Sequence, residues 1–381
     1  MIYLDNAASA PVHPKALAAA MPFLTDNFAN PSSAHSLGQA AALAIMTARE
    51  QCAAALGALP EEIFFTSGGT ESDNLAIFSA LRAMGGGKVV TTAIEHPAVL
   101  NACKAARHSV CSVSSEGIVS PRDIERLIDE DTALVSVMTA NNEIGTLQPI
   151  AEIGAICREK GVLFHTDAVQ AVGSTELDMS DLPVDMLSLS AHKIGGIKGA
   201  GLLYARRGTP LSAMLLGGGQ ERGIRSGTEN VAAIAALGAA MTEISRDIPE
   251  RVRKVSRLRD ILMTELEKIP FSRINGSRTE RLCGNVNVSF RDIDGEALVM
   301  SLDLMGVCCS TASACSSGKQ KRSHVLEALG ISGEWLDGTI RLTLSESNTE
   351  SEITRVAAII AECVERQRAA VIIAYPHNTP E

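Results

Sequence analysis

Residues 62–85 read EIFFTSGGTESDNLAIFSALRAMG: a short apolar run, a pair of glycines and a longer amphipathic stretch. The first part has the length and composition of a buried strand, and the second has the spacing of a helix. The same alternation recurs in KVVTTAIEH (88–96) before PAVLNACKAARH (97–108), and in ALVSVMTANNEIG (133–145) before IAEIGAICREKG (150–161). Repeated strand and helix units predict an α/β fold, with a mostly parallel sheet and helices on both faces.

The alternation of short apolar runs with polar or helical stretches continues along the chain and changes after Glu229. Three more apolar runs end in polar or glycine residues: VLFHTDAVQ (162–170), VDMLSLSAHK (184–193) and GLLYARR (201–207). After Glu229 the chain reads as helical, and residues 246–269 predict a long charged helix that leaves the large domain. Mixed strands and helices follow. We therefore predict a large domain over 15–250 and a smaller α+β domain built from 1–14 and 251–381.

Composition excludes several classes of protein. The 381 residues are 46% apolar and 20% charged, which is enough to bury a substantial core. No run approaches the ~18 apolar residues that a membrane span needs, and MIYLDNAASAP (1–11) carries an acidic residue where a signal peptide would be basic. We expect a cytoplasmic protein that does not bind membranes. The net charge of −10 argues against direct binding of nucleic acid.

Three of the nine cysteines lie in VCCSTASACSSGKQKRSHVL (307–326), which raises the possibilities of a metal site, a structural cluster or a nucleophile. An odd number of scattered cysteines in a large chain predicts reduced thiols. Cys308 and Cys309 are adjacent in an expected strand, so their side chains point to opposite faces and do not readily share one tetrahedral ion with Cys315. We predict no metal site. Cys308 and Cys309 are interpreted as small core residues, and Cys315 lies on a basic loop rich in glycine and serine.

Reactive side chains follow the apolar runs, at the strand ends where α/β sheets bind ligands. Lys193 follows one run, with Ser190 and His192 beside it, and Asp167 ends another, three residues before Gln170. A lysine buried at a strand end is costly unless it is paired or used covalently, although a lysine extended to the surface is the structural alternative.

Two further motifs point to a bound anion and a ring. The amides of residues 68–71 and the Thr70 hydroxyl could hold a phosphate at a helix N-terminus. His96 precedes a proline that can open a helix, and a purely structural role is its alternative. A lysine, an aspartate, a phosphate-binding helix start and a histidine together favour pyridoxal phosphate. The phosphate loops GxxxxGK[ST] and GxGxxG are absent from the sequence.

The motifs in combination resemble one enzyme family. They are YLDNAAS, NPSSAHSLG, FTSGGTESDN, EHPAVL, NNEIGTLQPI, HTDAVQAVG, SAHKIGGIKGAGLLY, GGGQERGIRSGTEN, STASACSSG and IRLTLS. Over about nine-tenths of its length the chain is similar to the cysteine desulfurases of the iron–sulfur cluster and nitrogen-fixation group, which are fold-type-I pyridoxal-phosphate enzymes, class V aminotransferase-like. The resemblance implies the same fold and the same cofactor.

The resemblance also implies a role for each matching residue. Lys193 would hold the cofactor covalently and move protons at the substrate Cα, Asp167 would pair with the ring nitrogen, and Gln170 would touch the ring hydroxyl. His96 would stack on the ring and act as acid or base. Five residues would bind the cofactor phosphate: Gly69, Thr70, Ser190, His192 and, from the other subunit, Thr228. Asn142 and Arg341 would bind the substrate carboxylate, and Asn142 would also bind the cofactor.

The implied reaction converts L-cysteine to L-alanine and leaves a persulfide on Cys315, which acts as the nucleophile. The implied partners are a second copy of the chain, as a homodimer, and a sulfur acceptor such as an iron–sulfur scaffold or a tRNA-thiolation protein. The sequence departs from the family at Ala312, at KQKR (319–322) and at Ser345 and Glu346. The basic segment is either a solvated loop or a group of cations that assists Cys315 or attracts an acidic acceptor.

Two other functions stay open at this point. A selenocysteine lyase or another aminotransferase-like enzyme would keep Lys193 and Asp167 but would not need Cys315. A non-enzymatic scaffold could keep the fold alone, although the presence of Lys193, Asp167, His96 and Cys315 argues against it.

Overall fold

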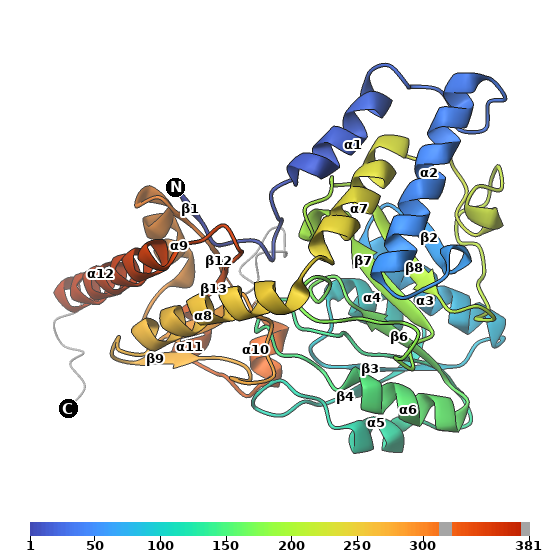
Figure 1. Ribbon diagram of the computed structural model, residues 1–381. Helices are drawn as coiled ribbons and strands as arrows, with labels where there is room; N and C mark the ends of the chain where they lie inside the picture. The colour runs from blue at the N-terminus through green and yellow to red at the C-terminus, as the bar shows by residue number, and fades with distance from the viewer. Residues whose placement is uncertain (312–321, 375–381) are drawn as a thin grey trace.

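The computed structural model describes residues 1–311 and 322–374, with side chains as far as residue 370. Figure 1 shows two regions, one around the larger sheet and one around a smaller sheet. In the described ranges no helix is both long and apolar enough to cross a membrane.

The larger sheet has seven strands in the order β2-β8-β7-β6-β5-β3-β4. The strands are β2 (Ile63–Thr66), β3 (Lys88–Thr92), β4 (Arg107–Cys111), β5 (Thr132–Ser136), β6 (Leu163–Asp167), β7 (Met186–Ser190) and β8 (Gly201–Ala205). From β4 to β7 all neighbours are parallel, whereas β8 runs antiparallel to both β2 and β7. The prediction of a mostly parallel sheet is confirmed.

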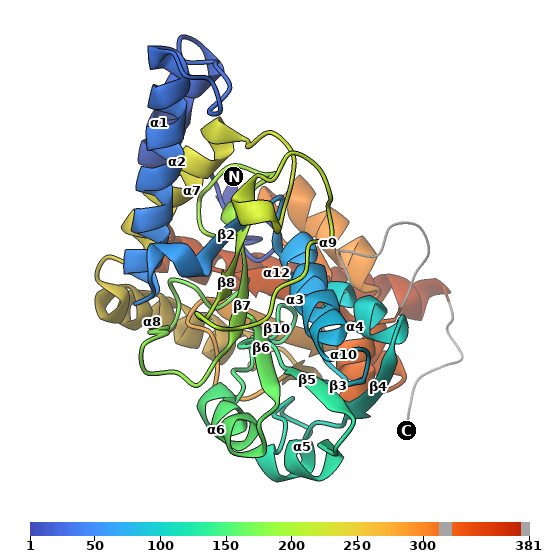
Figure 2. The ribbon, with the colours of Figure 1, turned by 90° about the vertical axis from the view of Figure 1, so that its right-hand side faces the viewer.

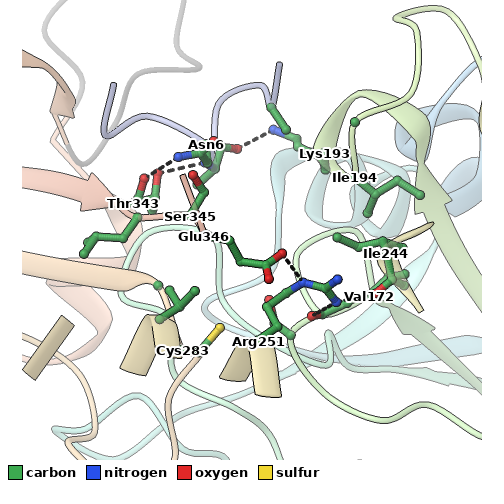
Figure 3. Close-up of a pocket in the computed structure, with 18 of the residues that line it drawn as sticks. Asn6, Val172, Lys193, Ile194, Ile244, Arg251, Cys283, Thr343, Ser345 and Glu346 are labelled. Carbon is green, nitrogen blue, oxygen red and sulfur yellow. Dashed lines mark hydrogen bonds and ion pairs between the residues drawn. The ribbon is translucent and has the colours of Figure 1, made fainter. Parts of the chain in front are cut away.

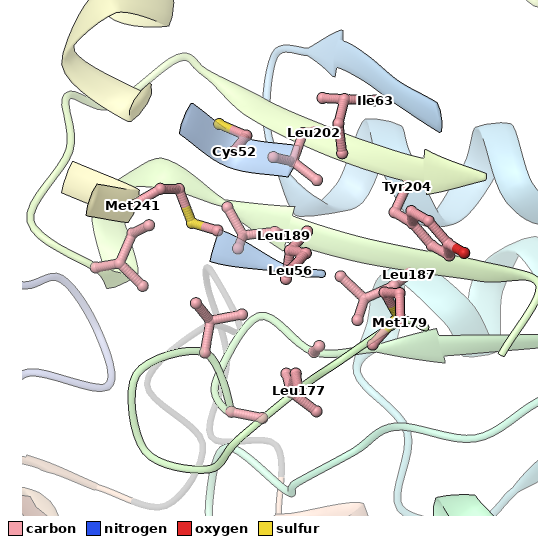
Figure 4. Packing of buried hydrophobic residues seen from close by; sticks show 14 of the residues in the cluster. Cys52, Leu56, Ile63, Leu177, Met179, Leu187, Leu189, Leu202, Tyr204 and Met241 are labelled. Carbon is pink, nitrogen blue, oxygen red and sulfur yellow. The ribbon is translucent and has the colours of Figure 1, made fainter. Parts of the chain in front are cut away.

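Helices cover both faces of this sheet, as predicted (Figure 2). Neighbouring strand residues divide between the two cores: Phe64 packs in the cluster with α3 and α4, and Phe65 packs in the cluster of the opposite face. That opposite cluster, with Cys52 and Leu189, is seen close up in Figure 4. One face carries α1 (Pro14–Leu24), α2 (Ser36–Ala55), α5 (Pro121–Leu127), α6 (Ile150–Lys160) and α7 (Val231–Ile244); the other carries α3 (Gly69–Ala83) and α4 (Pro97–Lys104).

A long helix, α8 (Ile248–Leu266), joins the two regions and confirms the helix expected over 246–269 (Figure 1). Its buried face, including Leu258 and Leu262, packs in the second core. That core covers an antiparallel sheet in the order β12-β13-β10-β9. The elements are β9 (Ser272–Ile274), β10 (Asn285–Phe290), β12 (Ser310–Thr311), β13 (Thr339–Thr343), α9 (Gly295–Leu304), α10 (His324–Ala328), α11 (Glu334–Asp337) and α12 (Glu350–Ala374).

The first residues of the chain belong to this second core. Strand β1 (Ile2–Tyr3) pairs in parallel with β11 (Val307–Cys308), and Leu4 is fully buried in the second core. Packing of the N-terminus on the C-terminal region is compatible with the division at 14/15 and 250/251, which stays a prediction.

The adjacent cysteines lie in different environments. Cys309 is buried in the second core, whereas Cys308, the last residue of β11, is partly exposed. Both are free thiols. The interpretation as a core residue is confirmed for Cys309 and is wrong for Cys308, and the expected single strand is divided, because Cys309 lies between β11 and β12 (Ser310–Thr311). Cys315 and the residues from Ala312 to Lys321 lie outside the described residues.

Candidate active site

A cavity of about 440 Å³ lies at the carboxyl ends of β6 and β7. Parallel strands bring their C-terminal residues to one edge of a sheet, which is where α/β proteins bind ligands. Ten of the predicted site residues line this cavity: Gly69, Thr70, His96, Asn142, Asp167, Gln170, Ser190, His192, Lys193 and Arg341.

Lys193 ends a short 3-10 helix, η2 (Ala191–Lys193), directly after the fully buried strand β7. Its Nζ donates hydrogen bonds to the carbonyl oxygens of Ala7, at 2.6 Å, and Ala8, at 3.0 Å. The side chain therefore turns across the cavity wall toward the N-terminal segment, and does not extend to the surface.

Asp167 and His96 are neighbours in the lining of the cavity. The Val169 amide donates to Asp167 Oδ1 at 2.9 Å, and burial raises the pKa of Asp167, although His96 and Lys193 oppose that rise. His96 caps α4 by accepting the Ala98 amide on Nδ1 at 3.2 Å. Burial lowers the pKa of His96, so the ring is neutral near pH 7 and carries its proton on Nε2.

The start of α3 forms one end of the cavity. Gly68, with φ 156°, caps the helix, and the residues that follow expose their amides at its N-terminus, where the helix dipole favours an anion. Close approach of the neighbouring strand requires glycine, since a Cβ on Gly201 would lie 2.6 Å from Gly68 Cα. His192 completes this end, and burial together with Lys193 and Lys198 lowers its pKa to about 4.

Arg341 enters the cavity from β13, with only 2% of its surface exposed. Its Nη2 forms an ion pair with Asp5 at 3.0 Å, and its Nη1 donates to the Asn142 carbonyl at 3.0 Å. The buried Nε has no hydrogen-bond partner within the described ranges. Because a buried N–H without an acceptor is costly, this atom marks a place for an acidic ligand.

The N-terminal segment has a role that the sequence did not predict. The Ala7 carbonyl accepts hydrogen bonds from both Lys193 and Gln170, the latter at 3.1 Å. The segment is held by Thr343 of β13, whose carbonyl accepts from Asn6 Nδ2 at 2.7 Å and whose hydroxyl accepts from the Ala7 amide at 2.8 Å. The only available signal was the small polar run DNAAS, since backbone carbonyls carry no residue type of their own.

Two buried glutamates near the cavity were also missed. Glu95 accepts from the Thr92 hydroxyl at 2.6 Å and the Met138 amide at 3.0 Å, and burial raises its pKa to about 8. Glu143 accepts a short hydrogen bond from Ser323, and burial raises its pKa to about 7. Neither residue had a sequence signal, because burial of a glutamate depends on the packing around it.

One predicted site residue of the described ranges, Thr228, does not line the cavity. Thr228 lies in a separate pocket of about 190 Å³ with Ser67 and Arg225, and its predicted contact with the partner subunit stays a prediction. Cys315 lies outside the described residues, as do Lys319 and Lys321. The remaining cation of the basic segment, Arg322, pairs with Asp337 at 3.4 Å on the surface.

A second cavity, of about 370 Å³, also has Lys193 in its lining (Figure 3). Its lining is mainly apolar and includes Val172, Ile194 and Ile244. Glu346, at one of the positions where the sequence departs from the family, forms an ion pair with Arg251 at 2.7 Å in this cavity. The departure therefore adds a contact between α8 and the segment after β13.

These features define the class: an α/β protein of the fold-type-I architecture, with a lysine and an aspartate at neighbouring strand ends facing a helix N-terminus. Comparison with known proteins identifies the family. Residues 2–356 match the aminotransferase class-V family, and the chain belongs to it.

Relatives within this family are similar over nearly their whole length. A cysteine desulfurase of Nostoc sp. is 47% identical over 97% of this chain and 94% of its own. The cysteine desulfurase IscS of Methanosarcina thermophila is 45% identical over 96% of this chain and 93% of its own. A solved NifS-like protein superposes with a TM-score of 0.90 at 36% identity, covering 96% of this chain and 99% of its own.

Proposed function

We propose that this protein is a pyridoxal-phosphate-dependent cysteine desulfurase, which removes sulfur from L-cysteine, releases L-alanine and carries the sulfur as a persulfide on Cys315. The observation that carries the proposal is the convergence of ten predicted residues on one cavity, with Lys193 and Asp167 on adjacent strand ends. The similarity to cysteine desulfurases over nearly the full chain supports it.

The residues present fit pyridoxal phosphate. A buried carboxylate, Asp167, suits a protonated ring nitrogen, and the neutral His96 ring lines the same cavity. The start of α3, with Thr70, Ser190 and His192, offers donors for a phosphate. When bound, pyridoxal phosphate supplies a conjugated ring that accepts the electrons released when the Cα–H bond of an amino acid breaks.

The chain's own groups would divide the remaining work. Lys193 would remove the Cα proton and return a proton to the product, because its amine lies at the cavity wall. Asp167 would keep a proton on the ring nitrogen, and Gln170 would touch the ring hydroxyl. Arg341 and Asn142 would orient the substrate carboxylate, for which the unpaired Arg341 Nε is suited.

Sulfur transfer would then occur at Cys315. Its thiolate would attack the substrate sulfur, forming a sulfur–sulfur bond while the carbon–sulfur bond breaks, and His96 would be the acid or base nearest the substrate. L-Cysteine and the thiol together thus become L-alanine and the persulfide.

We place the protein in the cytoplasm as a homodimer, in which Thr228 would reach the partner's cofactor phosphate. Exposed apolar side chains on α1 and α2 support the dimer, among them Leu17, Met21, Leu43 and Met46.

Mass spectrometry after incubation with L-cysteine tests the proposal. We expect one added sulfur atom on Cys315 and stoichiometric alanine, and neither in Lys193→Ala. Cys315→Ser should abolish sulfide and persulfide formation from cysteine, whereas an enzyme acting on selenocysteine alone would survive this substitution. Absence of added sulfur on Cys315 in the wild-type protein would contradict the mechanism. The sulfur acceptor, an iron–sulfur scaffold or a tRNA-thiolation protein, is to be identified by transfer of the labelled sulfur.

A further inference from the structure

A second carboxyl group lies close to that of Asp167. Asp73, on the second turn of α3, is 1% exposed and lines the cavity of about 440 Å³. Carboxylate oxygens of Asp73 and Asp167 and a ring nitrogen of His96 all lie within 4.8 Å of one another. Two buried negative charges at this separation repel strongly enough to change a proton affinity by roughly a hundredfold, so the pair holds one negative charge more readily than two.

The surroundings favour that charge on Asp167. Lys193 and the hydrogen bond from the Val169 amide both stabilise ionised Asp167. Asp73 contacts a different set of groups: its carboxylate accepts a hydrogen bond from Ser188, and its Oδ1 lies 3.7 Å from His165 Nε2. Within the described ranges Asp73 Oδ1 has no hydrogen-bond partner.

His165 does not supply the missing cation. It is fully buried, and its two ring nitrogens lie 2.9 Å from the hydroxyls of Ser136 and Ser188. Burial lowers the pKa of His165 to about 3, which leaves the ring neutral. The other titratable groups that face Asp73 are Asp167, Glu95, His96 and the Cys103 thiol. Ionised Asp167 disfavours a charge on Asp73, and Glu95, His96 and Cys103, all neutral near pH 7, contribute no cation.

We propose that Asp73 is a positioning residue: it keeps its proton, so that the single negative charge of the pair stays on Asp167. Its uncharged carboxyl group would also end a buried chain of hydrogen bonds through Ser188, His165 and Ser136. This inference rests on the proposed function, in which Asp167 faces the ring nitrogen of the cofactor, and it assigns the task of keeping that carboxylate ionised to a residue that does not touch the ring.

Infrared difference spectra of the cofactor-free protein test the proton directly. We expect the wild-type spectrum minus that of Asp73→Asn, near neutral pH, to contain the carbonyl stretch of one protonated carboxylic acid. The subtraction removes the signals of Glu95 and Glu143, which are also buried and raised in pKa. Asp123→Asn, at an exposed position of α5, is the matched control and should give a carboxylate difference. A carboxylate difference for Asp73→Asn would overturn the proposal.

The holoenzyme tests the consequence for Asp167. Asp73→Asn imitates the protonated acid, so the midpoint of the visible cofactor absorbance against pH should stay within about 0.3 unit of wild type. Asp73→Leu keeps the branched shape of the side chain but ends the hydrogen-bond chain, and should weaken cofactor retention by about tenfold. If Asp73→Leu fails to fold, judged by thermal unfolding without cofactor, Asp73→Ala replaces it as the apolar variant.

Each outcome of the holoenzyme experiment decides a separate point. A shift of a full pH unit in Asp73→Asn would show that residue 73 is charged and would overturn the proposal. Wild-type behaviour of the apolar variant would show that residue 73 does not position Asp167. A wild-type protein with no cofactor band would instead contradict the proposed function, while the infrared measurement would still decide whether Asp73 holds a proton.

Discussion

Two cavities share Lys193 in their linings, and they differ in whether their ionisable side chains are paired. In the cavity at the strand ends, Arg341 Nε and Asp73 Oδ1 are buried without partners within the described ranges. In the second cavity, Arg251 pairs with Glu346 and also donates to the carbonyls of Ile244 and Arg246, and the buried atom that lacks a partner within the described ranges belongs to the uncharged amide of Asn285. Buried ionisable groups that lack partners require a ligand or a proton, so the first cavity has the character of a binding site and the second that of a packed junction between the two regions.

The largest effect is expected from Lys193→Ala, because Lys193 lines both cavities. Loss of a general acid or base at the substrate Cα should lower kcat by about 10³-fold or more, measured as alanine formed from cysteine. The visible cofactor band should disappear in the same variant. Lys160→Ala, on the exposed side of α6, is the control and should retain both. Substantial activity in Lys193→Ala would exclude the role proposed for this lysine.

Matched substitutions of the two cavity arginines should give opposite results. Arg341→Lys removes the planar donor pair, and loss of a charged hydrogen bond, about 2 kcal/mol, should raise KM for cysteine roughly 30-fold. Arg251→Lys should leave KM within about twofold, because its interactions are with the protein itself. Equal effects of the two variants on KM would remove the distinction between the cavities.

The raised pKa of Glu95 predicts how stability depends on pH beside the first cavity. At pH values between 4.5, the ordinary pKa of a glutamate, and about 8, its pKa here, the folded protein holds a proton on Glu95 that the unfolded chain releases. Stability should therefore decrease as pH rises through this window, by at most about 1.4 kcal/mol per pH unit from this group. Chemical unfolding at several pH values should show a shallower slope in Glu95→Gln. A slope unchanged from wild type would mean that Glu95 is ionised throughout.

The smallest effect is expected at the junction itself. Glu346 is about half exposed, with 49% of its side chain accessible, so its ion pair with Arg251 is screened by solvent. Glu346→Gln should cost less than about 1 kcal/mol of unfolding free energy and leave kcat/KM unchanged. A large loss of activity with normal stability would show that the second cavity takes part in the reaction.

The sequence predicted the parts of the site whose residues carry their own chemistry. Lys193, Asp167 and His96 follow apolar runs, and parallel strands align such ends at one edge. The acceptors of the Lys193 amine could not be predicted, because Ala7 and Ala8 act through backbone carbonyls. Asp73 was missed for another reason: in the polar run TESDN it looks like a surface residue, and only the packing of α3 on the sheet buries it.

The contacts between the two regions were likewise hidden from the sequence. Ser345 and Glu346 stood out only as departures from the family pattern, and Arg251, the partner of Glu346, lies about a quarter of the chain away. The helix expected over 246–269 was clear from its periodicity, since its buried face repeats at helical spacing.

The contact of Asn6 and Ala7 with Thr343 also has a consequence for biosynthesis. Ala7 is held in place by a residue that is synthesised 336 positions later, so the acceptors of the Lys193 amine take their final positions only after the chain has been made past Thr343. The seven-stranded sheet draws on residues 63–205 and lacks this dependence. The enzyme should therefore complete its site later than its larger sheet, and cofactor should be captured firmly only by a chain that includes Thr343.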